Sequence, residues 1–187
     1  RVYNVSIDET HKEVRYLYTV PILLERYDDI KIIAIVRNPY DVLESWINAP
    51  SEYKAEWDLS KEWMFGQSKN EYKPENYYGY YKWKEWIKMA TDYKEKYPER
   101  LFVVKYEELN EKAVSTARAI FSFMNLPFTQ QTEQFIIDSQ SKTDADAYSV
   151  YKKKGDNRNN KHSLPQEIRA AIREDLKSFD EAHIWGY

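Results

Sequence analysis

The sequence contains no cysteine, which excludes disulfide bonds, thiolate metal sites and a cysteine nucleophile. No apolar run approaches the roughly 18 residues that a membrane-spanning helix needs. Glycine is also scarce, with four among 187 residues, and none of the four lies in a phosphate-cradling pattern. The formal net charge of −3 gives no sign of a protein that coats nucleic acid. We therefore expect no nucleic-acid partner, and any anion site must be local.

Nothing in the sequence divides the chain into parts. We find no internal repeat and no linker rich in Gly, Pro or Ser, so we expect a single domain over residues 1–187. Without cysteine to suggest an oxidising compartment, we expect a cytoplasmic protein. The chain opens on Arg1 rather than methionine, and we expect that an N-terminal part is lacking. A signal or anchor ahead of Arg1 stays open, as does the oligomeric state.

Short apolar segments alternate with amphipathic ones, which is typical of an α/β fold. Strands are expected at Ile32–Val36 and Leu101–Lys105, where apolar and β-branched residues gather. Helices are expected at Glu13–Tyr27 with a break near Pro21, and at Asn38–Ile47, Tyr81–Tyr97 and Ala113–Met124. The fold class predicted from this order is a three-layer α/β fold with a parallel sheet between helices.

The junction between the first strand and its helix is the most informative segment. Arg37 ends the strand, Asn38 can cap the helix, Pro39 suits its first position, and Asp41 places a carboxylate in its first turn. Free N–H groups at the helix start, the forked donors of Arg37 and the hydroxyl of Ser45 could together hold one phosphate. Taken alone, the pattern also fits an arginine that pairs with a neighbouring carboxylate.

Two later segments support the phosphate interpretation. The second strand runs into Tyr106-Glu-Glu-Leu109, and a polar stretch contains Lys153, Lys154 and Gly155. By order and spacing, these segments together with Arg37 and Ser45 resemble the sulfotransferase family that uses 3′-phosphoadenosine 5′-phosphosulfate (PAPS) as its donor. In that family an Arg at a strand end and a Ser eight positions later hold the 3′-phosphate. The motif tyrosine lies near the adenine, and a basic loop ending in Lys-Gly returns to the 3′-phosphate.

The resemblance implies a P-loop-like α/β core, PAPS as co-substrate and no metal. It assigns donor binding to Arg37, Ser45, Tyr106, Lys153, Lys154 and Gly155. Family members also carry a Lys/Arg-Ser-Gly-Thr loop for the 5′-phosphosulfate, which this sequence does not contain. A P-loop kinase of small molecules therefore stays open as an alternative, since similar anion-binding logic serves both. A non-catalytic module that binds a glycan or a protein with a decayed donor site is the other alternative.

A sulfuryl transferase needs a base for the acceptor hydroxyl. His11, Glu9 and Glu13 lie near the segment where family members place a His or Glu. We favour His11 because imidazole is partly basic at neutral pH, although a lone histidine is more often structural or simply exposed.

Aromatic residues are dense between positions 46 and 97. Several of these rings are expected to cover the sheet and pack helices together. Some could instead line a cleft for a small-molecule or glycan acceptor, whose hydroxyl would receive the sulfuryl group.

Overall fold

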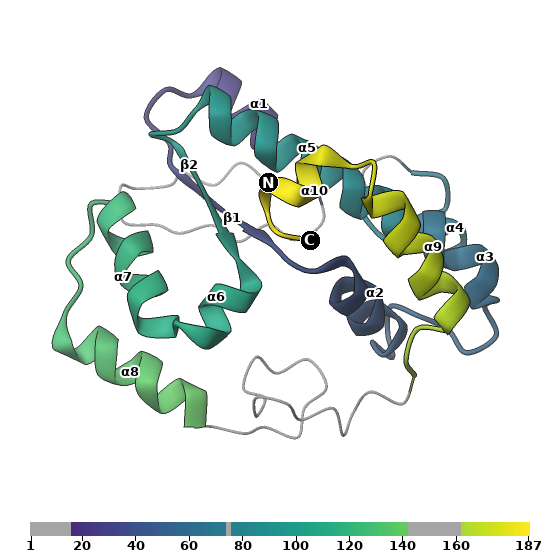
Figure 1. Cartoon of the computed structure of the whole chain (residues 1–187). Coiled ribbons are helices and arrows are strands. Elements are labelled where there is room, and N and C mark those ends of the chain that lie inside the picture. Colours follow the sequence, from purple (N-terminus) through teal and green to yellow (C-terminus); the bar gives the residue numbers. More distant parts are fainter. Residues whose placement is uncertain (1–15, 74–75, 142–161) are drawn as a thin grey trace.

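A computed structural model describes residues 16–73, 76–141 and 162–187 of the chain (Figure 1). Its sheet pairs β1 (Ile32–Val36) with β2 (Leu101–Lys105) in parallel. Ile32 lies opposite Leu101 and Val36 lies opposite Lys105. Both strands have the bounds predicted from the apolar runs: β1 ends just before the Asn38 cap and Pro39, and β2 leads directly into the helix that begins at Tyr106.

Helices make up most of the rest of the described chain. In order they are α1 (Thr19–Arg26), α2 (Pro39–Ile47), α3 (Leu59–Phe65), α4 (Gln67–Asn70), α5 (Tyr80–Lys96), α6 (Tyr106–Glu111), α7 (Ala113–Phe123), α8 (Gln130–Ser141), α9 (Gln166–Leu176) and α10 (Asp180–Ile184). Within the parts that the structure describes, no helix is both long and apolar enough to cross a membrane.

Helices lie on both sides of the two strands, as Figure 1 shows. On one face, β2 presents the buried side chains of Leu101 and Val103, and α5 packs there with α10 behind it. On the other face, Phe102 meets Phe123 of α7, with 5.3 Å between ring centroids. Since successive side chains of a strand point to opposite faces, this alternation buries both sides of β2. The described residues thus form an α/β arrangement that is rich in helices around a small parallel sheet.

The expected helix over Glu13–Tyr27 differs from the one observed. Residues 13–15 lie outside the described residues, Tyr16–Tyr18 form a turn, and α1 begins at Thr19. Pro21 therefore sits in the first turn of α1 and does not break the helix. The first N–H groups of a helix have no partner within it, so a proline there removes no hydrogen bond.

The aromatic insert contains two short helices, α3 and α4, that the sequence did not indicate. Gly66 links them with φ of +55°, a left-handed conformation that only glycine adopts readily. The buried side chain of Asn70 then ties the connection together: its amide nitrogen donates to the carbonyls of Phe65 and Tyr78, at 2.6 and 2.7 Å. This local closure depends on side-chain bonds rather than on a periodic apolar pattern.

The C-terminal helices fold back onto α5. Ile168, Ile172 and Leu176 of α9 are buried in the same core as the strands. At the edge of this contact, Asp175 accepts hydrogen bonds from Lys84 Nζ at 2.7 Å and from Tyr80 Oη at 2.9 Å. Burial disfavours the charged carboxylate, but the bonds from Lys84 and Tyr80 outweigh this effect, so the pKa of Asp175 lies below its usual value.

A carboxyl whose pKa is lowered by folding adds stability above its unfolded pKa, and that stability is lost as the pH falls through the folded value. We therefore expect Asp175→Asn to lower the free energy of unfolding by about 1 kcal/mol near neutral pH, a value discounted for partial exposure. The difference in unfolding free energy between wild type and variant should shrink as the pH falls below about 4. In that range the carboxyl of the unfolded wild type takes up its proton first, and the folded carboxyl follows at lower pH. Urea unfolding at several pH values measures both effects.

Glu174→Gln provides the matched control on the same helix. The pair that Glu174 forms with Lys177 is well exposed, with side-chain exposures of 75% and 66%, so its loss should leave stability unchanged. A deficit of the same size in both variants, or one that does not depend on pH, would contradict the assigned role of Asp175.

Candidate anion site at the ends of the two strands

Arg37 and Tyr106 lie side by side at the carboxyl ends of the strands. The strand register ends with Val36 opposite Lys105, so the residues that follow the two strands, Arg37 and Tyr106, are neighbours. The guanidinium carbon of Arg37 lies 4.3 Å from the centroid of the Tyr106 ring. A planar guanidinium stacks well on an aromatic face, and this contact fixes the plane of its donors. Both side chains keep part of their surface exposed, 31% for Arg37 and 37% for the whole of Tyr106.

The donors of Arg37 are not fully used by the described protein. Its Nη2 lies 3.9 Å from Asp41 Oδ2, a long contact to a carboxylate that is half exposed. Its Nε is buried and has no hydrogen-bond partner among the described residues. A buried donor without a partner costs about 1–3 kcal/mol and calls for a missing partner such as a ligand, ion or water. The alternative was that Arg37 pairs with a neighbouring carboxylate. Among the described residues, the long contact with Asp41 is the only such pair.

The start of α2 differs from our expectation in one respect. Asn38 caps the helix and Asp41 lies in its first turn, as predicted. However, the N–H of Asn38 donates to Glu107 Oε1 at 2.8 Å, and the N–H of Tyr40 donates to Asn38 Oδ1 at 2.9 Å. Pro39 has no N–H to offer. The prediction that free N–H groups here receive an anion is therefore wrong for these three positions, because the protein itself supplies their acceptors or removes the donor.

Ser45 lies two turns along α2 from the arginine. Residues four apart share one face of a helix, so Asp41 and Ser45 lie on the same face, with Arg37 at its base. Ser45 is exposed to solvent. The arginine and the hydroxyl that the sequence selected therefore border the same side of α2.

The C-terminal half of α2 is bonded to residues 162–164, which lead into α9. The side-chain amide of Asn48 donates to the carbonyl of His162 at 2.7 Å, and its oxygen accepts from the N–H of His162 at 3.0 Å. Glu44 accepts from the N–H of Leu164 at 3.2 Å and pairs with Arg169. These bonds attach residues 162–169 to the face of α2 that carries Glu44 and Asn48, and Asn48, three residues after Ser45, is its neighbour on the helix.

Several residues predicted to form the site lie outside the described residues. These are His11, Glu9 and Glu13 near the N-terminus and Lys153, Lys154 and Gly155 in the polar stretch. Their roles stay predictions. Among the residues that are described, no group of three or more His, Asp and Glu side chains could hold a metal ion.

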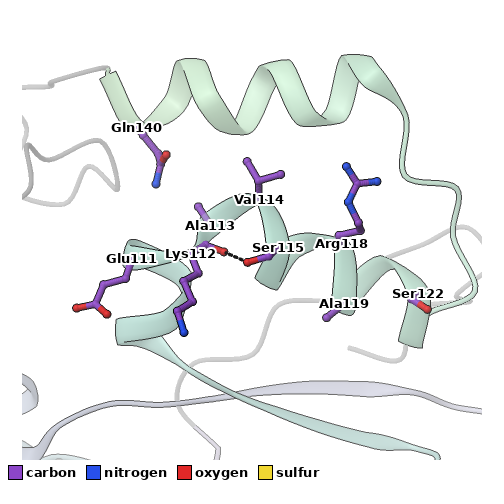
Figure 2. Close-up of a pocket in the computed structure, with 9 residues that line it drawn as sticks. All are labelled: Glu111, Lys112, Ala113, Val114, Ser115, Arg118, Ala119, Ser122 and Gln140. Atoms are coloured by element: carbon purple, nitrogen blue, oxygen red, sulfur yellow. Dashed lines mark hydrogen bonds between the residues drawn. The ribbon is translucent and has the colours of Figure 1, made fainter.

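An open cavity of about 680 Å³ lies elsewhere, between α7 and α8 (Figure 2). Lys112, Ser115 and Arg118 contribute to its lining from the α7 side, and Gln140 contributes from α8. Arg118 is already paired with Glu133 at 3.0 Å. None of Arg37, Ser45 and Tyr106 lines this cavity, so it is a second place where an anion could bind and a useful comparison for the strand-end site.

The aromatic residues divide between the two roles considered for them. Trp46, Trp63, Tyr80 and Trp83 belong to the buried core. Phe65 and Tyr81 instead form a stacked pair on the surface, with centroids 4.5 Å apart, and each is about half exposed. The expectation that several rings pack helices together holds for the first group, and the second offers flat apolar surface to solvent.

Sequence reasoning missed the residues that hold the strand end in place. Trp83 Nε1 donates to the carbonyl of Arg37 at 2.8 Å. Glu107, part of the Tyr-Glu-Glu-Leu motif, accepts from Asn38 N–H and, through its second oxygen, from the Tyr187 hydroxyl at 3.1 Å. Burial and the nearby Glu107 carboxylate raise the pKa of Tyr187, which keeps this hydroxyl protonated as a donor. No sequence pattern links these positions, which are 46 to 80 residues apart.

Comparison with known proteins gives one match. No curated protein and no solved structure matches the chain. The family model described as sulfotransferase domain matches residues 9–181, which covers both strands, α2 and α9. The chain therefore belongs to the sulfotransferase domain family, a family of sulfuryl-transferring enzymes.

Proposed function

We propose that the protein transfers a sulfuryl group from PAPS to an acceptor hydroxyl, with the 3′-phosphate of the donor on Arg37 and Ser45 and the adenine near Tyr106. The observation that carries this proposal is the arginine itself. Arg37 is charged, partly exposed, stacked on an aromatic ring, and has one buried donor with no partner among the described residues. Membership of the sulfotransferase domain family favours sulfuryl over phosphoryl transfer.

The geometry around Arg37 suits a doubly charged phosphate. The guanidinium carbon lies over the Tyr106 ring at 4.3 Å, and a contact of this kind covers a face of the guanidinium rather than the edge where the donors lie. The competing carboxylate of Asp41 is 3.9 Å away and half exposed, so it binds Arg37 weakly. A phosphate that accepts two parallel N–H bonds would hold the arginine more strongly, since charge-assisted bidentate contacts are about twice as strong as neutral ones.

The basic residues of the polar stretch are proposed to reach the same phosphate. The chain is attached to α2 at His162, beside Ser45. Gly155 precedes that anchor by seven residues, and seven residues span at most about 25 Å. This reach is sufficient for Lys153 and Lys154 to approach a ligand on Arg37 and Ser45.

The reaction proposed is an in-line displacement at sulfur. The acceptor oxygen forms a bond to sulfur while the bond from sulfur to the 5′-phosphate oxygen breaks, so adenosine 3′,5′-bisphosphate leaves. The acceptor proton passes to a base, which we propose is His11, with Glu9 and Glu13 as the alternatives. Positioning and cationic stabilisation of the leaving phosphate supply the rate acceleration. The acceptor is proposed to be a small molecule or a glycan, for which exposed rings such as Phe65 and Tyr81 offer contact surface.

If Arg37 reads the 3′-phosphate, adenosine 3′,5′-bisphosphate should bind more tightly than adenosine 5′-phosphate, as measured by calorimetry. Arg37→Ala should then weaken binding of the bisphosphate by about 2 kcal/mol, because a charge-assisted contact is lost. Arg37→Lys should restore only part of the affinity, because an ammonium cannot form the forked contact.

Arg118→Ala is the matched control for this measurement. Arg118 also stacks on a ring, with its guanidinium carbon 4.2 Å from the centroid of Phe128, but it lines the cavity between α7 and α8. We expect this variant to bind both nucleotides like the wild type. Equal wild-type affinities for the two nucleotides, or a loss that follows Arg118 instead of Arg37, would refute the proposed donor site.

Lys154→Ala should weaken binding of the bisphosphate about fivefold or more while leaving the melting temperature of the ligand-free protein unchanged, because the side chain is expected to bind phosphate rather than to support the fold. Lys61→Ala makes the same change in charge at a well-exposed residue of α3, with a side-chain exposure of 80%, and should alter neither property. If Lys154→Ala lowers the melting temperature without reducing affinity, Lys154 has a structural role instead.

A further inference from the structure

The peptide unit between Arg37 and Asn38 is held at both ends by side chains. Its carbonyl accepts from Trp83 Nε1 at 2.8 Å, and its N–H donates to Glu107 Oε1 at 2.8 Å. The two side chains come from α5 and α6. Because a peptide unit is planar, two bonds at opposite ends fix its orientation.

The register of the strands explains why a side chain takes this place. Ile32 bonds toward the β2 side, through the carbonyl of Arg100, so the carbonyls of Ile35 and Arg37 point to the opposite edge of β1. On that edge two indoles of α5, three residues apart, supply the donors: Trp86 Nε1 bonds to the carbonyl of Ile35 at 2.9 Å, and Trp83 bonds to that of Arg37. Among the described residues, these indoles supply the donors that a neighbouring strand would otherwise provide at these two positions.

Trp83 is itself held rigidly. Its side chain is 4% exposed and is stacked on Tyr80, with centroids 5.6 Å apart and planes at 12°. Phe179 and Tyr187 pack against its other sides, with centroids at 6.1 Å each. Tyr187 also donates to Glu107, so the groups at both ends of the Arg37–Asn38 peptide belong to one packed cluster.

We propose that Trp83 is a positioning residue for Arg37, setting the direction in which the arginine side chain leaves the backbone. The proposal rests on the proposed function only for the identity of the ligand that Arg37 receives. When the indole N–H is absent, the carbonyl of Arg37 loses its partner and the peptide can rotate, which moves the guanidinium off the Tyr106 ring. A bidentate phosphate contact depends on direction, so a small rotation lowers affinity.

The test compares Trp83→Phe with Trp86→Phe. Each change removes one indole N–H. The N–H of Trp83 bonds to the carbonyl of Arg37, whereas that of Trp86 bonds to the carbonyl of Ile35 within β1. Calorimetry should show that Trp83→Phe weakens adenosine 3′,5′-bisphosphate about fivefold. The affinity for adenosine 5′-phosphate, which has no 3′-phosphate, should change less than twofold. Trp86→Phe should leave the ratio of the two affinities unchanged. If both tryptophan variants lower this ratio equally, or neither lowers it, the positioning role is refuted.

A second measurement follows Arg37 directly and needs no ligand. Because the guanidinium lies over Tyr106, the ring current should shift the NMR resonance of the Arg37 Nε–H upfield, and Arg37→Lys assigns that resonance by its loss. Trp83→Phe should move the resonance toward the value of an unstacked arginine, and Trp86→Phe should not. An unmoved resonance in Trp83→Phe overturns the proposal.

The two measurements separate the two proposals. If the wild type binds both nucleotides equally, the proposed donor site fails, while the NMR shift still decides whether Trp83 orients Arg37. Should Trp83→Phe not fold, the isosteric replacement of the Trp83 indole by benzothiophene keeps the shape of the ring and removes the N–H alone. The same resonance and the same pair of affinities are then measured on that variant, with the same expected and contrary results.

Discussion

The parallel pairing of β1 with β2 is the constraint on which the candidate site depends. Arg37 and Tyr106 are 69 residues apart in the sequence, and they meet only because Val36 lies opposite Lys105. A shift of the register by one residue would turn Tyr106 to the other face of the sheet and leave the guanidinium without its ring. Burial of alternate residues of β2, such as Leu101 and Val103, opposes that shift. The hydrophobic pattern of the strand therefore fixes a polar contact at its end.

The C-terminal segment connects this contact to the rest of the fold. Residues of α9 fill the core against α5, and Asp175 bonds to two side chains of that helix. Beyond α10, Tyr187 reaches Glu107, which in turn holds the backbone next to Arg37. The segment that begins at His162 is bonded to Asn48 at the end of α2, the helix that carries Ser45. The elements that carry Arg37, Ser45 and Tyr106 are thus bonded to the chain that follows the polar stretch.

Sequence reasoning located the regular elements near the site better than the contacts between them. Both strands and the cap at Asn38 followed from apolar runs and from capping chemistry, which are local. The helix before β1 was predicted with a break near Pro21, whereas α1 begins at Thr19 and contains Pro21 in its first turn. In the sequence, a proline in a first turn looks the same as a break inside a helix. The small helices of the aromatic insert depend on Gly66 and on the bonds of Asn70, which no periodic pattern reveals. The bond that occupies the N–H of Asn38 could not be predicted either, because its acceptor Glu107 comes from a distant helix.

These contacts also indicate what kind of anion site the strand end can be. Glu107 takes the N–H of Asn38, and the cap takes that of Tyr40, so these two backbone donors at the helix start are committed to the protein. In the proposed donor site, recognition then rests mainly on side chains, chiefly the stacked Arg37 with the hydroxyl of Ser45 on the same side of α2. Side-chain donors are directional and depend on rotamers, whereas helix dipoles attract any anion. A net charge of −3 and the carboxylates of Asp41 and Glu107 close by would repel an anion that does not engage Arg37 in its forked geometry. In the proposed donor site, selectivity for a phosphate would therefore depend on how firmly the backbone orients that one arginine.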